Sequence, residues 1–429
     1  MKQNNFVPKK IILAAGILFF YLNVHAQLVN AGGTITIESG AIVYTQSDIT
    51  NSTNGIITNE GKIISAGSFI NVPNASLSGN GIYSVQGNFT NTGTYNQDNS
   101  LLEFYGTGNS NLKNTNGSVY ILQLNKAPNS FVNLKGNAGV INSVIFLADQ
   151  NWIKLGKNTL TLRSNASVQG FSNKRFFITN GAGLLRKNKI GTTAFTFPVG
   201  FTKNTYNAIS ITENGTTDDY SVQALEHALL QGSTGNPISS GGIDAGWFIS
   251  EATPGNGNAV IEANWKNTDE LLNFDKTKCM VVRYNGTKWD YKPAQAGAAT
   301  GNLYRFISRS GLSSFGNFTV LSVTNPTIIE NQFISGNKPV LMMDNAETVI
   351  KVYPTIVQHV VNVEVQSGLK NIQKMDVNIV DVNGKMVYQK TGTSFNSQQI
   401  ILPNLAQGVY FVHILYGTEK FVQKIIVSM

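Results

Sequence analysis

A repeat of twenty residues between Gly33 and Asn99 constrains this chain more than any other feature. Three apolar columns and one polar column recur with that step: Ile49, Phe69 and Phe89; Ile37, Ile57 and Leu77; Val43, Ile63 and Tyr83; and Asn51, Asn71 and Asn91. Within one unit the apolar positions lie 6, 6 and 8 residues apart, which predicts a three-sided coil with a short strand on each side. Stacked coils bury such side chains against their neighbours, so we predict a right-handed parallel β-helix.

The asparagine column supports the same fold, because stacked carboxamides at one corner can hydrogen-bond from coil to coil. Two alternatives are a chance alignment in a chain rich in Asn and Thr, and flat hairpins that recur. After Ser100 the period blurs, but short apolar strands still alternate with Gly and Asn turns. We therefore expect the solenoid to occupy residues 27–195.

A different pattern begins in "TTAFTFPVGFTKNTYNAISIT", where alternating strands follow one another with Gly, Asn and Pro turns between them. Strands at this spacing are typical of an antiparallel β-sandwich, which we place at residues 196–325. The segment from Tyr284 to Trp289 predicts a hairpin with an Asn-Gly turn. The stretch "DDYSVQALEHALLQG" is predicted to be a short helix or an irregular insertion.

The N-terminus has the three parts of a secretory signal peptide. An apolar run of twelve residues, Ile11 to Leu22, follows three lysines, Lys2, Lys9 and Lys10. A spanning helix needs about 20 apolar residues, so we interpret residues 1–26 as a leader for the Sec translocon rather than as a membrane anchor. The small Ala26 predicts cleavage between Ala26 and Gln27. No later segment is long and apolar enough to span a bilayer as a helix, so we expect a soluble mature chain.

The end of the chain is patterned separately. "VNIVDVNGKMVYQK" has apolar residues on both sides of Asn383-Gly384, which is the strongest short hairpin signal because a type I′ turn needs φ > 0 at both central positions. Two further strands are expected, from Val409 to Leu415 and from Phe421 to Val427. With "VVNVEV" in front, residues 351–429 predict a small all-β sandwich that is large enough to fold alone.

These last residues resemble the type A C-terminal sorting domain of the Bacteroidetes type IX secretion system. The resemblance covers Val352 to Met429 and rests on "VYP", "VDVNGKMV", "LPNLAQGVYFVHI" and "KFVQKIIV". The family usually begins with Tyr-Pro-Asn-Pro, whereas Thr355 and Ile356 stand in the second half of that motif here. The motif positions in this chain are Tyr353, Pro354, Asp381, Asn383, Gly384, Lys385, Leu405, Gly408, Val409 and Tyr410.

The resemblance implies that residues 351–429 are an address rather than a catalytic module. It implies recognition by the type IX secretion machinery, passage from the periplasm across the outer membrane, and removal of the module during attachment to surface lipopolysaccharide or release. Residues 326–350 are then a linker. Two cargo stretches, Phe197 to Gly200 and Gly311 to Val320, also resemble segments of adhesin-like surface proteins from the same bacteria.

The charge of the chain argues against one class of partner. Charged residues make up only 13% of the sequence, well below the roughly 25% of an average soluble protein. The net charge of +8 falls to +5 without the three lysines of the leader, and about +2 of that belongs to residues 27–350. Nucleic-acid binding rests on clustered Lys and Arg, so nucleic acid is not expected as a partner.

The sequence offers few candidates for catalysis. No GxSxG, HExxH, P-loop or EF-hand pattern occurs. A catalytic pair is conceivable among four acids of one segment, although a solvated loop is the simpler interpretation: Glu262, Asp269, Glu270 and Asp275. Cys279 begins an apolar run and is interpreted as a core residue. His227 has no metal-ligating neighbour in the sequence and is interpreted as structural or exposed.

A second candidate is a platform for stacking sugar rings, formed by Trp247, Trp265, Trp289, Tyr284 and Tyr291. Aromatic residues on alternating strands more often pack in the core, and we favour that interpretation. We accordingly predict no catalytic, cofactor-binding or metal-binding residue.

These observations predict a non-enzymatic, secreted or surface-displayed protein with a structural or adhesin-like role. Its candidate surface partners are lipopolysaccharide, another polysaccharide or a surface protein. The alternative is a carbohydrate-active enzyme or a polysaccharide-binding protein. Clustered carboxylates or an exposed aromatic row in a groove would favour that alternative.

Overall fold

The computed structural model describes residues 27–115, 117–290, 298–300, 303–322, 349–353, 356–357, 360–366, 375–393, 397–402, 405–416 and 419–428. The chain divides into two compact units at Pro326 and Thr327. We call residues 27–322 the cargo unit and residues 349–428 the C-terminal unit. The regular structure in these ranges is strand apart from one 3₁₀ turn, η1 (Asn267–Asp269), so the fold is all-β as predicted. Within them, no helix has the length and apolar content that crossing a membrane requires.

One side of the solenoid is a parallel sheet of nine strands. Across the sheet they are β1 (Leu28–Asn30), β4 (Ile49–Asn51), β7 (Phe69–Asn71), β10 (Phe89–Asn91), β13 (Ser110–Asn114), β15 (Ser130–Leu134), β17 (Asn151–Lys154), β20 (Arg175–Ile178) and β23 (Val199–Gly200). Ile49 pairs with Phe69, and Phe69 pairs with Phe89. The predicted step of twenty residues is therefore confirmed for β4, β7 and β10.

The second side is the parallel half of a thirteen-stranded sheet. Its strands are β3 (Ile42–Thr45), β6 (Lys62–Ser65), β9 (Ile82–Val85), β12 (Leu101–Gly106), β14 (Ser118–Lys126), β16 (Ala138–Phe146), β18 (Thr159–Leu162) and β21 (Leu184–Ile190), with β19 (Ser167–Gln169) beside β16. Val43 pairs with Ile63, and Ile63 pairs with Tyr83. This column is also as predicted.

The third side is short. As a separate sheet it has four strands, β2 (Thr34–Ile37), β5 (Ile56–Asn59), β8 (Ser76–Ser78) and β11 (Thr94–Tyr95). Beyond it, the third and second sides are joined in the long strands β14 and β16. The first part of β16 pairs with β18, and its second part pairs with β19. The turn of β17, β18 and β19 again has three separate strands, so the three-sided coil is confirmed beyond the first turns.

The predicted column of Ile37, Ile57 and Leu77 is wrong by one member. Ile57 pairs with Leu77, but its partner in the preceding turn is Ile35, while Ile37 lies opposite Asn59. The step from Ile35 to Ile57 is 22 residues, which is two more than the predicted step of twenty. Ile37 is nevertheless buried, because a shift of two residues keeps a side chain on the same face of a strand.

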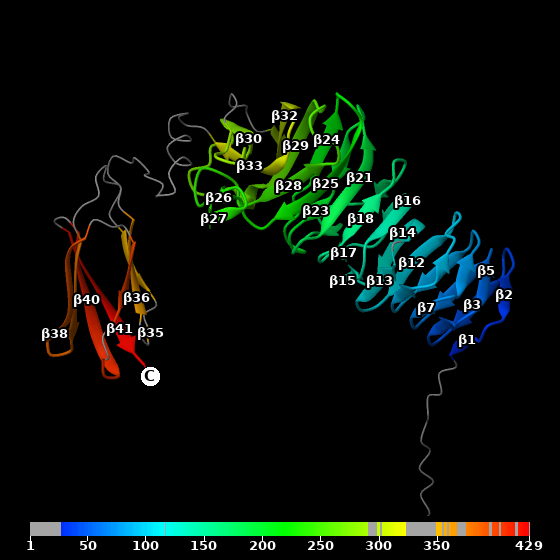
Figure 1. The fold of residues 1–429 in the computed structure, drawn as a ribbon, viewed down its shortest axis with the longest axis horizontal. Coiled ribbons are helices and arrows are strands. Elements are labelled where there is room, and N and C mark those ends of the chain that lie inside the picture. Colours follow the sequence, from blue (N-terminus) through cyan, green and yellow to red (C-terminus); the bar gives the residue numbers. More distant parts are fainter. Residues whose placement is uncertain are drawn as a thin grey trace, which may run out of the picture. The chain divides into compact units, whose positions relative to one another are not determined.

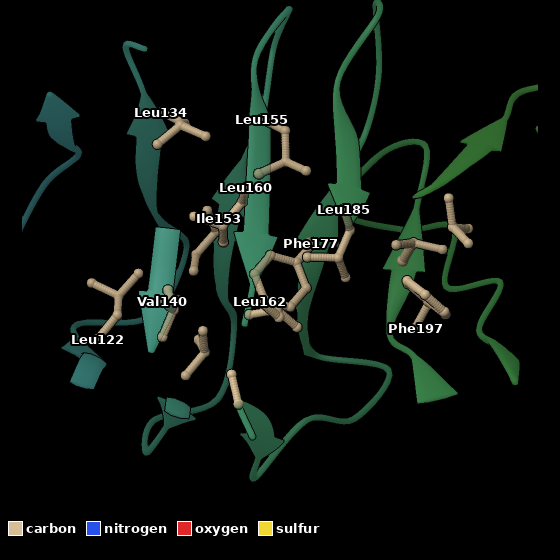
Figure 2. Close-up of a cluster of buried hydrophobic side chains, with 14 of the residues drawn as sticks. Leu122, Leu134, Val140, Ile153, Leu155, Leu160, Leu162, Phe177, Leu185 and Phe197 are labelled. Carbon is tan, nitrogen blue, oxygen red and sulfur yellow. The ribbon is translucent and has the colours of Figure 1, made fainter. Parts of the chain in front are cut away.

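Between the sides lies one apolar core (Figure 2). Leucine, isoleucine, valine and phenylalanine from successive turns fill it, among them Leu122, Val140, Ile153 and Phe177, which are all completely or almost completely buried. Each turn packs mainly on the turns before and after it, as expected of a solenoid. The same buried cluster continues into the antiparallel strands that follow.

Along one corner of the core runs a ladder of buried asparagines, which is longer than the predicted column. The side-chain amide of each donates to the carbonyl oxygen of the next at 2.9, 2.8, 2.7 and 2.7 Å, in the order Asn30, Asn51, Asn71, Asn91 and Asn114. Asn30 and Asn114 do not fit a fixed step of twenty residues, because they lie 21 residues from Asn51 and 23 residues from Asn91. The ladder satisfies polar groups that would otherwise be buried without partners.

Antiparallel pairing begins where β21 meets β25 (Asp218–Leu225), and the same sheet continues through β28 (Gly246–Glu251), β33 (Gly316–Ser322) and β30 (Cys279–Arg283). A second sheet contributes to the same core, with β22 (Phe195–Phe197), β24 (Ile209–Glu213), β29 (Ala259–Lys266), β32 (Tyr304–Leu312) and β31 (Ala298–Thr300). The strands from β1 to β30 form one row, beside which β26 (Leu229–Gln231) and β27 (Thr234–Pro237) make a hairpin (Figure 1). Solenoid and antiparallel sheets thus share one sheet and one core.

The helix or insertion predicted within residues 218–232 is wrong for its first half, which is strand β25. Tyr220, Val222 and Ala224 are buried on alternate positions, which is the period of a strand. The predicted turn at Asn285-Gly286 is present, because Tyr284 and Trp289 form an antiparallel bridge.

The C-terminal unit is the small β-sandwich that was predicted. One sheet contains β34 (Val349–Tyr353), β36 (Val360–Gln366) and β39 (Ser397–Ile401). The other contains β35 (Ile356–Val357), β41 (Glu419–Val427), β40 (Gly408–Tyr416), β37 (Met375–Asp381) and β38 (Met386–Thr393). Both sheets contribute to a single buried core, for example Val361 and Val363 from the first and Val412 and Ile414 from the second.

Candidate functional site

In the C-terminal unit, four motif residues lie at the turn between β37 and β38. The N–H of Gly384 donates to the carbonyl of Asp381 at 3.0 Å, and the N–H of Asp381 donates to the carbonyl of Lys385 at 3.0 Å. The Asp381 carboxylate accepts from the N–H groups of Asn383 and Lys385, both at 2.9 Å. Asp381 therefore closes the hairpin with its backbone and caps the loop with its side chain.

This turn is not the predicted type I′ turn. The hydrogen bonds define a three-residue loop, Val382 to Gly384, in which a type I turn is followed by Gly384 in the left-handed region at φ 79°. Of the two described residues Asn383 and Gly384, only the glycine takes a positive φ. The physical reason is Asp381, since an aspartate at the first position of a type I turn accepts from the loop amides.

The other motif residues lie around the start of β40. Leu405 packs against the core, and Val409 pairs with Ile426. Gly408 is the first residue of the strand. Tyr410 is buried, and its hydroxyl donates to the carbonyl of Ala406 at 2.9 Å, which ties the preceding segment to the sheet. Sequence reasoning did not predict this bond, although a tyrosine four residues after an exposed loop position is a signal for it.

Of the remaining predicted positions, some lie within the described residues and others lie outside them. Tyr353 ends β34 and pairs with Asn362. Pro354, Ala26 with the rest of the leader, and most of the linker at 326–350 lie outside the described residues. Gln27, on the far side of the predicted cleavage point, is exposed, and its amide donates to the hydroxyl of Thr50 at 3.1 Å.

One face of the C-terminal unit presents apolar side chains to solvent. On β41, Val422 and Ile426 are 58% and 40% exposed, and His413 of β40 lies opposite Val422. Exposed apolar side chains grouped on a sheet are a common feature of protein-binding surfaces.

In the cargo unit, the four candidate catalytic acids are each held by partners of their own. Glu270 pairs with Arg305 and accepts from the indole N–H of Trp265 at 3.2 Å. Glu262 accepts from Ser308 at 3.3 Å, and Asp275 accepts from the hydroxyl of Thr277 at 2.6 Å. The interpretation of this segment as a solvated loop is wrong for Glu262, which lies in strand β29, and for Glu270, which forms a largely buried ion pair.

Asp269, the fourth of these acids, holds the 3₁₀ turn. Its carboxylate accepts from the amide of Asn207 at 3.1 Å and from the backbone N–H of Lys266 at 3.2 Å. Burial raises its pKa, and these hydrogen bonds oppose the rise. Its contacts, like those of the other three acids, are to the protein itself.

A second group of acids lies at the start of β25, beside the ends of β24 and β28. Buried Glu213 accepts from the hydroxyl of Tyr220 at 2.5 Å and from the N–H of Asn258 at 2.7 Å. Burial and the Glu213 carboxylate raise the pKa of Tyr220. Burial, with Asp218 and Glu213 nearby, also raises the pKa of Glu251. Among the described residues no three side chains of His, Cys, Asp or Glu are grouped so as to hold a metal ion.

The favoured interpretation of the tryptophans as core residues, rather than as a sugar-stacking platform, is confirmed. Trp247, Trp265 and Trp289 are at most 2% exposed, so they belong to the core, and Tyr291 lies outside the described residues. Cys279 is buried, which confirms the interpretation of this residue. His227 is about one-third exposed and pairs with Asp244 at 2.6 Å, a structural contact.

Two lysines of the solenoid are buried. The ammonium group of Lys126 donates to the carbonyls of Gln86 and Tyr105 at 3.0 and 2.9 Å, and burial lowers its pKa to about 8. Lys187 donates to the carbonyls of Arg163 and Ser164 at 2.8 and 2.5 Å. Both cations satisfy backbone carbonyls at the ends of strands rather than facing a ligand.

Comparison with known proteins identifies the class of the C-terminal unit. Residues 351–428 match the family model described as the secretion system C-terminal sorting domain. This unit is therefore a sorting domain of the type IX secretion system, as the motifs predicted. No curated protein and no solved structure matches the chain.

The sorting domain indicates the destination of the whole protein. The protein is one that the type IX secretion system exports to the cell surface or the medium, and the sorting domain interacts with the machinery of that system. The match covers the C-terminal unit only.

Proposed function

We propose that the cargo unit is a non-catalytic, adhesin-like body that contacts a polysaccharide or another surface protein through its outer faces. The observation that carries this proposal is the continuity of the thirteen-stranded sheet, whose main path runs from β3 to β30 without interruption. At about 4.8 Å between strands, such a path extends for about 50 Å. A long sheet over one core is a stiff support for repeated contacts with a polymer or with another protein.

The chemistry of the outer face supports the same proposal. Outside the sheet, the hydroxyl of Ser84 and the amide of Gln123 donate to the carboxylate of Glu103 at 2.5 and 3.1 Å. Near the start of the sheet, Ile42 and Tyr44 are 65% and 59% exposed. Hydroxyl, amide and carboxylate groups beside exposed apolar side chains suit a sugar polymer or a protein better than an anionic ligand.

The protein also needs a route of export from the cytoplasm to the cell surface. Residues 1–26 direct the chain to the Sec translocon and are removed between Ala26 and Gln27, and the sorting domain then directs the folded cargo from the periplasm outward. Surface lipopolysaccharide is the proposed anchor where the protein stays on the cell. This order follows from a leader at one end of the chain and an address at the other.

The test of the non-catalytic role uses the secreted full-length protein. It is offered to a panel of polysaccharides and to intact bacterial surfaces, and both binding and release of reducing sugar are measured. We expect binding without turnover, and we expect Glu262→Gln and Glu270→Gln to leave binding within a few fold. Removal of a catalytic carboxylate lowers a rate by about 10² to 10⁴. Sugar release that one of these substitutions abolishes would contradict the proposal and favour a carbohydrate-active enzyme.

A further inference from the structure

We propose that the cargo unit binds a neutral sugar residue in the pocket between the outer face of β25, β28 and β33 and the β26–β27 hairpin. This inference rests on the proposed function and deepens it by naming a ligand class and a site. The pocket has a volume of about 610 Å³. Small-molecule sites generally occupy about 300 to 1,000 Å³.

The floor of the pocket is a row of three side chains on neighbouring strands. Gln223 of β25 lies opposite Phe248 of β28, and Phe248 lies opposite Asn317 of β33. Residues opposite each other in an antiparallel sheet project from the same face about 5 Å apart. The row therefore presents an aromatic ring with a carboxamide on each side, and Phe201, Leu225 and Leu229 add apolar surface.

This arrangement matches the chemistry of a sugar ring. A pyranose has an apolar face of C–H groups and a rim of hydroxyls, so it needs a flat apolar partner and hydrogen-bonding groups beside it. Phe248 supplies the first and the two carboxamides supply the second. Gln223 is fixed in place, because its amide nitrogen donates to the carbonyls of Thr179, at 3.3 Å, and Gly181. Its carbonyl oxygen is left as an acceptor.

The charges around the pocket favour a neutral ligand. No lysine or arginine is among the described residues that line it, and its ionisable residues are Glu226 and His227. Proteins recognise carboxylates, sulfates and phosphates mainly with Arg and Lys. Acidic sugars would meet Glu226 without a compensating cation, so they should bind poorly.

The wall of the pocket is held in position without a ligand. The segment that connects β25 to β28 is closed at its two ends by a hydrogen bond. His227 Nδ1, after β25, and the carboxylate of Asp244, before β28, lie 2.6 Å apart. The indole N–H of Trp289 donates to the carbonyl of Leu229 at 3.2 Å. At Gly232, whose φ is 72°, a β-carbon would lie 2.5 Å from the ring of Tyr284, so only glycine permits this close approach. A wall fixed before binding lowers the entropic cost of binding.

The experiment uses the secreted full-length protein and arrays of neutral and acidic oligosaccharides, followed by titration calorimetry with the neutral oligosaccharide that binds best. Phe248→Ala should weaken its binding at least about tenfold, because the stacking partner is lost. Ser233→Trp places a large side chain at an exposed position of the wall and should block entry while leaving the floor intact. Phe171→Ala removes a partly exposed aromatic outside the pocket and is the matched control.

The expected result is loss of neutral-sugar binding in Phe248→Ala and Ser233→Trp, with Phe171→Ala unchanged and all unfolding temperatures close to that of the unmodified protein. Binding that survives in Ser233→Trp would overturn the pocket while leaving the adhesive role intact. Binding of acidic sugars only, or of no sugar, would also overturn it. Adhesion to intact surfaces is measured in parallel, so that failure of the proposed function is seen separately.

Discussion

The side-chain amide of Asn51 donates to the carbonyl oxygen of Asn71 at 2.8 Å, twenty residues further along the chain and one turn further along the solenoid. Both side chains are completely buried. The bond joins two turns by a polar contact inside an apolar core, where an unpaired amide would be costly. It therefore fixes the register in which successive turns stack.

The first prediction concerns this ladder. Asn71→Ala removes the bonds to Asn51 and Asn91, and buried polar groups left without partners cost about 1 to 3 kcal/mol each. We expect the free energy of unfolding of the cargo unit to fall by about 2 to 4 kcal/mol. Thr90→Ala, on the outer side of the neighbouring strand, should cost less than about 0.5 kcal/mol. Equal losses in urea denaturation of the two variants would contradict a structural role for the ladder.

A second prediction concerns the ion pair of Asp290 and Arg309, whose two nitrogen–oxygen distances are both 2.7 Å. Burial alone would raise the pKa of Asp290, but hydrogen bonds from Arg309 and from the backbone of Arg283 hold it below its usual value. Asp290→Asn leaves the buried guanidinium of Arg309 without its counter-charge. We expect a loss of about 3 kcal/mol at pH 7.

The pH dependence of that loss has a definite sign. A carboxyl group whose pKa is lowered by folding stabilises the protein above its unfolded pKa, which is near 3.8. This stabilisation disappears as the pH falls through the folded pKa. The difference between the two proteins in thermal unfolding should therefore be largest at neutral pH and shrink below about pH 4. Glu38→Gln, at an exposed acid far from this pair in the sequence, is the control and should leave the unfolding temperature unchanged at neutral pH.

A third prediction concerns the turn of the sorting domain. Gly384 has φ 79°, and no atom lies within 4 Å of the position of a β-carbon there, so Gly384→Ala adds backbone strain without a clash. We expect a cost of about 1 to 2 kcal/mol. Hydrogen exchange of the amides of β37 and β38 in the full-length protein should become faster. Val382→Ala, at a residue 65% exposed, should leave exchange unchanged. A matching acceleration in both variants would argue against the strained position.

The stacking of the solenoid turns could be predicted from the sequence where successive turns contain twenty residues, and not where the number of residues per turn changes. Phe69, Phe89 and the central asparagines stand twenty residues apart, so their pairing could be predicted. Asn30 and Asn114 could not be found in this way, because the turns that hold them contain 21 and 23 residues. The merging of the third side with the second in β14 and β16 is decided by contacts between turns rather than by local pattern.

The sorting motifs could be read from the sequence because they are contiguous, whereas the pocket could not. Gln223, Phe248 and Asn317 are distant in sequence and meet only through the antiparallel register of three strands. The tryptophans did not indicate a sugar site, because aromatic residues on a strand can also pack on the face of the sheet that covers the core. The type of turn at Asn383-Gly384 was wrong because the Asp381 side chain competes with the preference of the dipeptide.

The most direct test of the account is the destination of the cargo when the sorting domain is removed. A chain that ends at residue 350 keeps the complete core of the cargo unit, because the two units have separate buried clusters. We predict that it folds, with the unfolding transition of the cargo unit retained, but remains inside the cell, while the full-length protein and its Phe171→Ala variant reach the surface or the medium. The measurement is protease accessibility on intact cells together with detection in the medium. Folded cargo at the surface or in the medium in normal amounts, without residues 351–429, would contradict the account.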